Sequence, residues 1–156
     1  MKVIIVSDSH GNFGILKRIV EQEDPFDLMV HLGDGLDEVY RIQRLMEFRL
    51  DAVSGNNDPP GLAPEYLLLK FGKRRLLFTH GNSYQVNQSL NILYQTAKGL
   101  KANIVFYGHT HCYNDCQLRR IRFLNPGTVC SYLSKESSYI KMELLDNELK
   151  FNRVII

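Results

Sequence analysis

Short apolar runs alternate with amphipathic segments over the first 55 residues of the chain. Residues 3–7, 27–32 and 50–54 are short runs dominated by aliphatic side chains, which is typical of strands buried on both faces. Residues 12–23 and 36–46 lie between these runs and place their apolar side chains at helical spacing. This alternation predicts βαβ units and a parallel sheet.

The rest of the chain reads mostly as strands. Residues 65–71 and 74–79 are strand-like and are joined by Gly72-Lys73, a two-residue hairpin signal. A polar, helix-compatible stretch follows at residues 86–100, and residues 103–107 form another short buried strand. Further strands are predicted at 115–120, 121–124, 138–145 and 149–155, with the last turn at Asp146-Asn147. This order predicts an α/β fold in which two sheets pack together with helices outside.

Length and charge restrict the class of protein. A chain of 156 residues, 44% of them hydrophobic and 23% charged, is expected to form a single domain over residues 1–156. The net charge is only +2 and no long basic stripe is visible, so we expect no nucleic-acid partner. The basic clusters at residues 73–75 and 119–122 are interpreted as charged hairpin edges, which block aggregation between strands.

Cysteine usage and the absence of long apolar runs favour a cytoplasmic protein. The chain has three cysteines, Cys112, Cys116 and Cys130, and no C-x-x-C pair, which suggests reduced thiols. Only four apolar residues follow Lys2 before the chain becomes polar, too few for the core of a signal peptide. No run approaches the ~18 apolar residues of a membrane span. We therefore expect no membrane partner.

Five predicted strands are each followed by side chains that commonly bind metals or phosphate. They lie in Asp8-Ser9-His10, Gly33-Asp34, Gly55-Asn56-Asn57-Asp58, His80-Gly81 and Gly108-His109-Thr110-His111. Ligands of open α/β sheets bind outside the carboxyl ends of the strands, so these segments predict one crowded site. Residues i and i+2 of an extended backbone point to the same side. We therefore expect Asp8 with His10, and His109 with His111, each to reach a common ion.

Taken together, the motifs D-x-H, G-D, G-N-x-D, H-G and G-H-x-H resemble those of the calcineurin-like metallophosphoesterase superfamily. The chain is similar to the small single-domain phosphodiesterases of its bacterial and archaeal branch, which is related to the small retromer subunit. Asn125-Pro126-Gly127 also resembles a turn of that branch. The resemblance implies a four-layer αββα sandwich, in which two mixed β-sheets are flanked by helices.

The resemblance further implies two divalent metal ions. Asp8, His10 and His111 would hold the first ion, Asn56, His80 and His109 the second, and Asp34 would bridge them. Mixed nitrogen and oxygen ligation suits Mn, Fe, Zn or Ni better than a purely oxygen-bound Mg or Ca; Mn is our first choice, and Mg stays an alternative. Two ions can acidify a bridging water and clamp the oxygens of an in-line displacement. The implied function is a phosphodiesterase that hydrolyses a small diester through a metal-bridging hydroxide.

One position departs from the wider family. Most superfamily phosphatases have a histidine where this chain has Asn57, and that histidine is thought to protonate the leaving group. An amide cannot do so at neutral pH. We therefore expect the enzyme to prefer activated leaving groups or to take the proton from water. We expect Asn57 to contact a phosphoryl oxygen.

Asp58 is interpreted as a turn residue that orients its neighbours. His31 is interpreted as a buried, hydrogen-bonded residue.

Several alternatives stay open. Asn12 is predicted to cap the helix that follows it, and contact with a substrate phosphate is the other interpretation. A phosphomonoesterase is the second enzymatic reading. A non-catalytic scaffold of the same fold is the third possible function. A scaffold is expected to have lost some of the metal ligands, whereas all seven candidate ligands are present in this chain. The sequence leaves open the natural diester and whether the C-terminal strands support a homo-oligomer.

Overall fold

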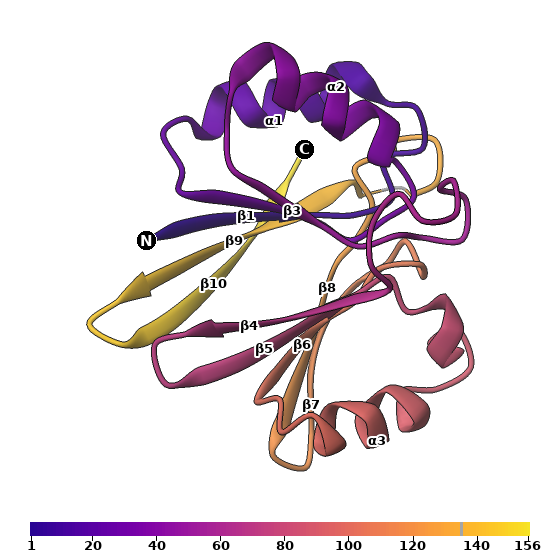
Figure 1. Ribbon diagram of the computed structural model, residues 1–156, viewed down its shortest axis with the longest axis vertical. Coiled ribbons are helices and arrows are strands. Elements are labelled where there is room, and N and C mark those ends of the chain that lie inside the picture. Colours follow the sequence, from indigo (N-terminus) through magenta and orange to yellow (C-terminus); the bar gives the residue numbers. More distant parts are fainter. Residues whose placement is uncertain (135) are drawn as a thin grey trace.

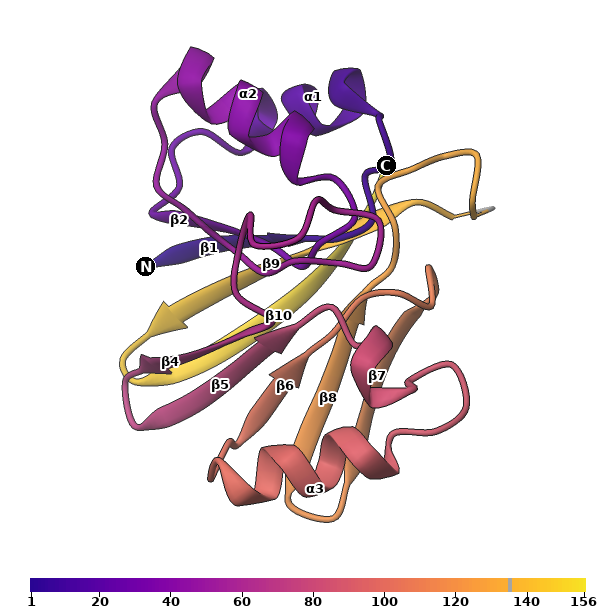
Figure 2. The same cartoon turned by 45° about the vertical axis from the view of Figure 1, so that its right-hand side comes forward.

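Two five-stranded mixed sheets face one another at the centre of the protein. The computed structural model describes residues 1–134 and 136–156. One sheet has the order β10-β9-β1-β2-β3 and the other the order β4-β5-β6-β8-β7. Helices α1 and α2 cover the outer face of the first sheet, and α3 covers the outer face of the second (Figures 1 and 2). The predicted αββα sandwich is therefore confirmed.

The elements follow the predicted alternation closely. They are β1 (Lys2–Val6), α1 (Phe13–Glu23), β2 (Leu28–His31), α2 (Leu36–Met46), β3 (Leu50–Ala52), β4 (Tyr66–Phe71), β5 (Arg74–Thr79), a 3₁₀ turn (Asn82–Tyr84), α3 (Asn91–Gly99), β6 (Ile104–Phe106), β7 (Tyr113–Leu118), β8 (Ile121–Pro126), β9 (Ser138–Leu145) and β10 (Glu148–Ile155). No helix in the described part of the chain is long and apolar enough to cross a membrane.

The prediction of one helix over residues 86–100 was wrong in its first part. The chain forms a 3₁₀ turn and further turns up to residue 90, and α3 begins only at Asn91. Residues 85–88 instead form an isolated turn, in which the Gln85 carbonyl accepts the Gln88 N–H at 2.9 Å and the Ser89 N–H at 3.3 Å. The strand predicted at 115–120 also lies slightly earlier, because Arg119 has φ 55° and turns the chain between β7 and β8.

Strand direction places one end of each sheet at the same edge of the molecule. In the first sheet β1, β2 and β3 are parallel, and in the second β5, β6 and β8 are parallel. Aromatic rings fill the space between the sheets: the rings of Phe78 and Phe106 stack with centroids 5.1 Å apart, and Phe151 meets Phe106 at 5.8 Å. The core therefore fixes both sheets, and the loops after β1, β2, β3, β5 and β6 converge.

A buried carboxylate fastens the end of α1 to the first sheet. Glu23 accepts hydrogen bonds from the Tyr139 hydroxyl at 2.6 Å and from Lys141 Nζ at 3.1 Å, and it pairs with Lys2 Nζ at 2.8 Å. Burial alone would raise the pKa of Glu23, but the contacts with Lys2, Tyr139 and Lys141 outweigh it and lower the pKa to about 2. The ionised form is therefore favoured in the folded protein.

Replacing Glu23 with glutamine is expected to lower the free energy of unfolding by about 2 kcal/mol at pH 7. The stabilisation is complete above the pKa of the unfolded protein, near 4.5, and is lost as the pH falls toward about 2. Between these two values the unfolded protein binds a proton at Glu23 that the folded protein does not, and this favours unfolding. Urea unfolding at pH 7 and pH 3 measures this, and the difference between variant and wild type should shrink at pH 3. Glu21→Gln, at an exposed pair with Lys17, is the control and should change little at either pH. A difference that is equal at both pH values contradicts the role of the charge.

Candidate metal centre

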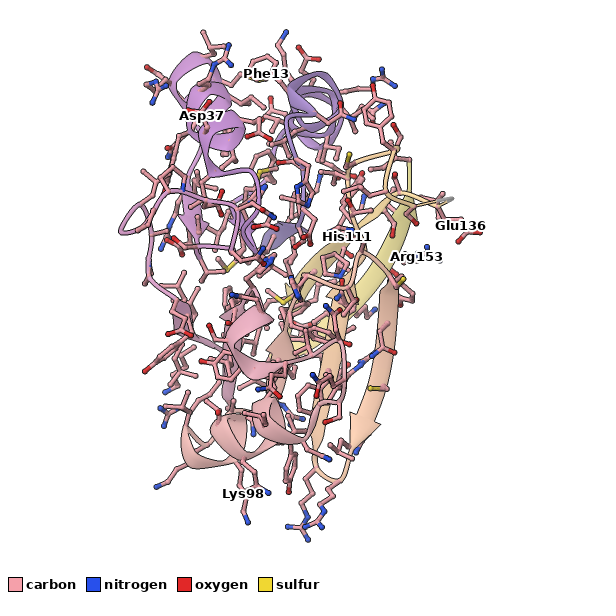
Figure 3. The ribbon with its side chains drawn as sticks, turned by 90° about the vertical axis from the view of Figure 1, so that its right-hand side faces the viewer. Phe13, Asp37, Lys98, His111, Glu136 and Arg153 are labelled. Atoms are coloured by element: carbon pink, nitrogen blue, oxygen red, sulfur yellow. The ribbon has the colours of Figure 1, made fainter. Side chains whose placement is uncertain are left out.

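The predicted site segments meet at the shared carboxyl edge of the two sheets. The Asp8 N–H donates to the Gly33 carbonyl at 3.0 Å, and the His10 N–H donates to the Asp34 carbonyl at 3.0 Å. In the second sheet, the Gly108 N–H donates to the His80 carbonyl at 2.9 Å. These backbone bonds hold loops from distant parts of the sequence against one another. Figure 3 labels His111 beside this edge, with its side chain among those of the neighbouring loops.

One cluster of candidate ligands consists of Asp8, His10 and His111. Asp8 Oδ1 lies 3.2 Å from His111 Nε2 and 3.7 Å from His10 Nε2. The two histidine nitrogens are 3.2 Å apart. All three residues place ligand atoms within 4.8 Å of one another. This is the set that the family resemblance implies for the first ion.

The second cluster surrounds His80. Its Nε2 atom lies 3.2 Å from Asn56 Oδ1 and 3.2 Å from His109 Nδ1. The same nitrogen is 3.4 Å from Asp34 Oδ2, which is also 3.7 Å from His10 Nε2. Asp34 therefore lies between the two clusters, at the place where a bridging carboxylate would act. The structure brings all seven candidate ligands together, and their binding of metal stays a prediction.

Two features of the donor set fit a bound cation. Asp8 Oδ1 is buried without a hydrogen-bond donor among the described residues, and an unpaired buried carboxylate oxygen is costly unless a positive charge faces it. His80 Nδ1 lies 2.8 Å from the Leu32 carbonyl, which leaves the lone pair of Nε2 directed into the site. That lone pair faces Asn56 Oδ1, also an acceptor. Divalent ions, one at each cluster, would satisfy these groups.

Left-handed backbone conformations concentrate at the site. Five of the seven candidate ligands have positive φ: Asp8 (55°), His10 (42°), Asp34 (57°), His109 (68°) and His111 (56°). Such residues cost of order 1–3 kcal/mol each, and they persist at sites that the surrounding structure holds in place. The sequence analysis paired Asp8 with His10, and His109 with His111, on the ground that residues i and i+2 of an extended backbone point to the same side. That ground was wrong, because these segments are not extended. His10 and His111 meet in one cluster, and His109 turns to the other.

Asp58 organises the backbone beneath Asp34. Its carboxylate accepts hydrogen bonds from the N–H groups of Asp34 (2.7 Å), Gly35 (2.9 Å), Leu36 (2.9 Å) and Gly55 (2.8 Å). The first residues of α2 have no side-chain cap of their own, so Asp58 satisfies their N–H groups through space. The preceding residue along the chain, Asn57, donates its N–H to Asp34 Oδ1 at 2.8 Å and its amide to Oδ2 at 2.6 Å.

The structure also shows the surroundings of His31 and Asn12, the two other residues interpreted from the sequence. His31 is fully buried; its Nδ1 accepts the Gly33 N–H at 3.1 Å, and its Nε2 lies 3.2 Å from Ser9 Oγ. Burial lowers the pKa of His31 to about 4, so the ring is neutral. The Asn12 side chain accepts the Ile15 N–H at 3.4 Å, which confirms the helix cap.

The sequence analysis did not identify several residues that hold the candidate ligands in place. The Ser7 hydroxyl donates to Asp8 Oδ2, and the Thr128 hydroxyl donates to the Asp8 carbonyl at 2.7 Å. Asn125 donates its amide to the Gly108 carbonyl at 2.9 Å and so holds the loop of His109 and His111. Only Asn125 had a signal, the Asn-Pro-Gly turn. The hydroxyl partners depend on contacts between distant segments.

The charges of the site influence one another strongly. Burial would raise the pKa of Asp8, but His10, His111 and His80 outweigh it and hold the pKa well below its usual range. Burial likewise opposes protonation of His80, but Asp34 and Asp8 raise its pKa. Burial and the neighbouring His80 lower the pKa of His109. Burial would also raise the pKa of Asp34, but His80 and Asn57 outweigh it and lower the pKa. Both carboxylates are therefore ionised at neutral pH, as metal binding requires.

A methyl group at Gly55 is expected to disrupt the site. The Cβ of alanine there would lie 2.1 Å from Asp34 Oδ1 and 2.5 Å from the Asp34 backbone nitrogen, so Asp34 must move. We expect Gly55→Ala to lower the free energy of unfolding by about 2 kcal/mol and to weaken metal binding, as measured by urea unfolding and metal titration. Gly14→Ala is the control: its Cβ meets nothing within 4 Å, and it lies inside α1, where alanine should slightly stabilise the helix. Unchanged metal affinity in Gly55→Ala would contradict the tight fit around Asp34.

Comparison with known proteins identifies the family of this arrangement. A family model described as a calcineurin-like phosphoesterase superfamily domain matches residues 1–147. The chain is 37% identical over 130 residues to the probable metallophosphoesterase YsnB of Bacillus subtilis, covering 83% of this chain and 75% of that protein. It is 29% identical over 175 residues to the phosphodiesterase YfcE of Escherichia coli, covering 96% of this chain and 89% of that protein.

Solved structures agree on the fold. A predicted phosphoesterase from Streptococcus pneumoniae superposes with a TM-score of 0.82 at 27% identity, over 99% of this chain and 88% of that one. Vps29 from Entamoeba histolytica, solved in complex with zinc, superposes with a TM-score of 0.76 at 22% identity, over 99% of both chains. The second likeness concerns the fold alone.

Proposed function

Because this chain belongs to the calcineurin-like phosphoesterase superfamily, we propose that it is a two-metal phosphodiesterase acting on small diesters. The observation that carries the proposal is the buried Asp8 Oδ1 atom, which faces His111 Nε2 at 3.2 Å and has no hydrogen-bond donor in the described chain. A cation at this point would satisfy a group that the protein alone leaves unpaired. The phosphodiesterase name of the Escherichia coli relative supports the choice of a diester.

Each candidate ligand has a proposed place. Asp8, His10 and His111 would hold one ion, Asn56, His80 and His109 the other, and Asp34 would serve both. When bound, two divalent ions supply an acidified water and neutralise charge on the phosphoryl group. Mn is our first proposal, with Ni, Zn, Fe or Mg as alternatives.

The residues of the chain prepare the site for an anionic substrate. Asp8 and Asp34 are the only carboxylates proposed as ligands, so they offset only part of the charge of two divalent ions, and the site stays attractive to a phosphate. Asn57 is exposed, and its amide, 2.6 Å from Asp34 Oδ2, is a donor at the mouth of the site. We propose that this amide donates to a phosphoryl oxygen of the substrate.

Asn57 also limits the choice of substrate. Its amide cannot give up a proton at neutral pH, so the chain provides no general acid at this position. A diester whose leaving group is already a stable anion needs no such acid. We therefore propose a preference for activated leaving groups.

A phosphomonoesterase and a metal-binding scaffold are the competing functions. The likeness to Vps29 is in the fold alone, while the complete set of seven candidate ligands favours catalysis. The test is hydrolysis of a chromogenic bis-aryl phosphate diester beside the matching monoester, with metal-stripped protein reloaded with Mn, Ni, Zn or Mg. Metal-dependent diester turnover supports the proposal, and faster monoester turnover supports the second enzyme. No turnover by folded, metal-occupied protein supports the scaffold.

A further inference from the structure

Two basic clusters that are distant in the sequence meet at one pole of the molecule. Arg74 begins β5, and Arg119-Arg120 form the turn between β7 and β8. Lys98 and Lys101 lie at the end of α3, just before β6. Because β5, β6 and β8 are parallel, these residues share the amino-terminal edge of the second sheet, opposite the metal centre. In Figure 3, Lys98 lies at one end of the molecule and His111 lies near its middle.

The side chains at this pole surround two adjoining hollows. One, of about 390 Å³, is lined by Arg74, Arg120 and Arg122 together with the β9–β10 hairpin. The other, of about 670 Å³, is lined by Lys98, Lys101, Arg119 and Arg120. The first hollow opens on the inner face of the second sheet, and the other lies beside α3 on its outer face. They meet at the amino-terminal edge of the sheet, where Asn103 and Arg120 line both. We call the two hollows and this edge together the basic groove.

The basic groove concentrates positive charge in a nearly neutral protein. Its lining includes six of the 19 lysines and arginines and one of the 17 acidic residues, Glu148. The groove thus has a formal charge of +5, and the rest of the chain −3. Arg122 is paired with Asp115 at 2.7 Å, whereas the other five cations form no ion pair within the described part of the chain. A polyanion would relieve their mutual repulsion.

Uncharged groups in the groove match the chemistry of nucleotide bases. Asn103, Gln117 and Asn147 line it, and amide side chains pair with base edges. Asn103 Oδ1 already accepts the Arg75 N–H, and Gln117 Nε2 already donates to the Arg119 carbonyl, so these two residues offer a base the Asn103 NH₂ group and the Gln117 amide oxygen. The Tyr94 ring also lines it, with the Arg119 guanidinium 5.6 Å from its centroid; bases stack on such groups. None of the exposed large hydrophobic residues belongs to the lining, so no large apolar side chain projects from the groove for insertion into a bilayer.

We propose that the basic groove binds single-stranded nucleic acid, with its unpaired lysines and arginines on the phosphates and its amides and Tyr94 on the bases. This goes beyond the proposed hydrolase activity and does not depend on it. The groove and the metal centre are separated by the length of β6, about 17 Å for the five steps from Asn103 to Gly108. Binding therefore requires neither metal nor Asp34.

The test is fluorescence anisotropy of a labelled 12-nucleotide single-stranded RNA with the full chain in EDTA. Five phosphate contacts predict that the logarithm of the association constant falls with the logarithm of salt concentration with a slope of about −3.5. Arg119→Glu combined with Arg120→Glu should weaken binding at least about 10-fold. Arg18→Glu combined with Arg44→Glu makes the same change of charge at exposed positions of α1 and α2 and should weaken it less than about 3-fold.

Several results overturn the proposal. One is the absence of RNA binding by the wild-type protein at 50 mM salt. Equal losses in the two double variants would show an effect of net charge rather than of the groove. Binding to phosphatidylserine vesicles without binding to RNA would assign the pole to membranes, and full displacement of RNA by equimolar ATP would assign it to small anions. Asp34→Asn should bind RNA like the wild type, so failure of the hydrolase proposal leaves this one intact.

Discussion

Replacing Asp34 with asparagine is expected to lower metal-dependent diester turnover by about 10³-fold, the scale on which loss of one electrostatic contact at a reacting centre acts. Asp34 Oδ2 lies 3.4 Å from His80 Nε2 and 3.7 Å from His10 Nε2, so one carboxylate faces both candidate clusters. An amide offers a neutral oxygen in place of the shared charge. We expect the variant to bind fewer than two ions per chain and to remain folded, because the new amide oxygen can still accept the Asn57 N–H.

Turnover of the bis-aryl diester and metal content after dialysis measure both effects. Asp37→Asn is the matched control, because Asp37 is exposed on α2 and should change neither quantity. Circular dichroism verifies the fold of both variants. Wild-type turnover in Asp34→Asn would exclude Asp34 as a bridge, whereas loss of turnover in both variants would show that the change acts through α2.

Replacing Asn57 with histidine is expected to increase the turnover of diesters that have a poor leaving group by about 10²-fold, the lower end of the contribution from a general acid. Asn57 is exposed and stands directly beside Asp34, so an imidazole has room there. Diesters with a nitrophenolate leaving group should gain little, because that group departs without a proton. The gain should be largest below the pKa of the new imidazole, near 6.5, and should decline as the pH rises.

Rates for an aryl and an alkyl leaving group, measured from pH 5.5 to 8.5, test this prediction. Asn57→Ala is the control, since it removes the amide without adding an acid and should lower the rates for both substrates. If Asn57→His accelerates both substrates equally, or neither, the missing acid is not what limits the enzyme.

The fold was predictable because its signals are local. Apolar runs and helical spacing predicted α2 at residues 36–46 and β9 at residues 138–145, which are the bounds observed. The Asp146-Asn147 turn was also predicted, and both residues have the positive φ that such turns require. The start of α3 was missed because residues 85–88 form an isolated turn, for which the sequence has no clear marker.

The candidate ligands of the site could be predicted from the sequence, but the residues that hydrogen-bond to them and to their loops could not. The candidate ligands stand at strand ends, where parallel topology brings them together. Three backbone bonds to Asp58 join residues 34–36, at the start of α2, to the loop after β3, and periodicity does not describe such a contact. The residues of the basic groove are likewise separate in the sequence, at 74, 98–101 and 119–122, so net charge and a search for one long basic stripe do not reveal that they share one edge of the second sheet.

The most direct test of the two-metal centre is a titration of metal-stripped protein with Mn²⁺ while diester turnover and bound metal are measured in the same samples. Two clusters that share Asp34 predict that turnover stays low at one ion per chain and reaches its plateau at about two. Turnover that reaches its plateau at one ion per chain, or that is absent when two are bound, would contradict the two-metal account.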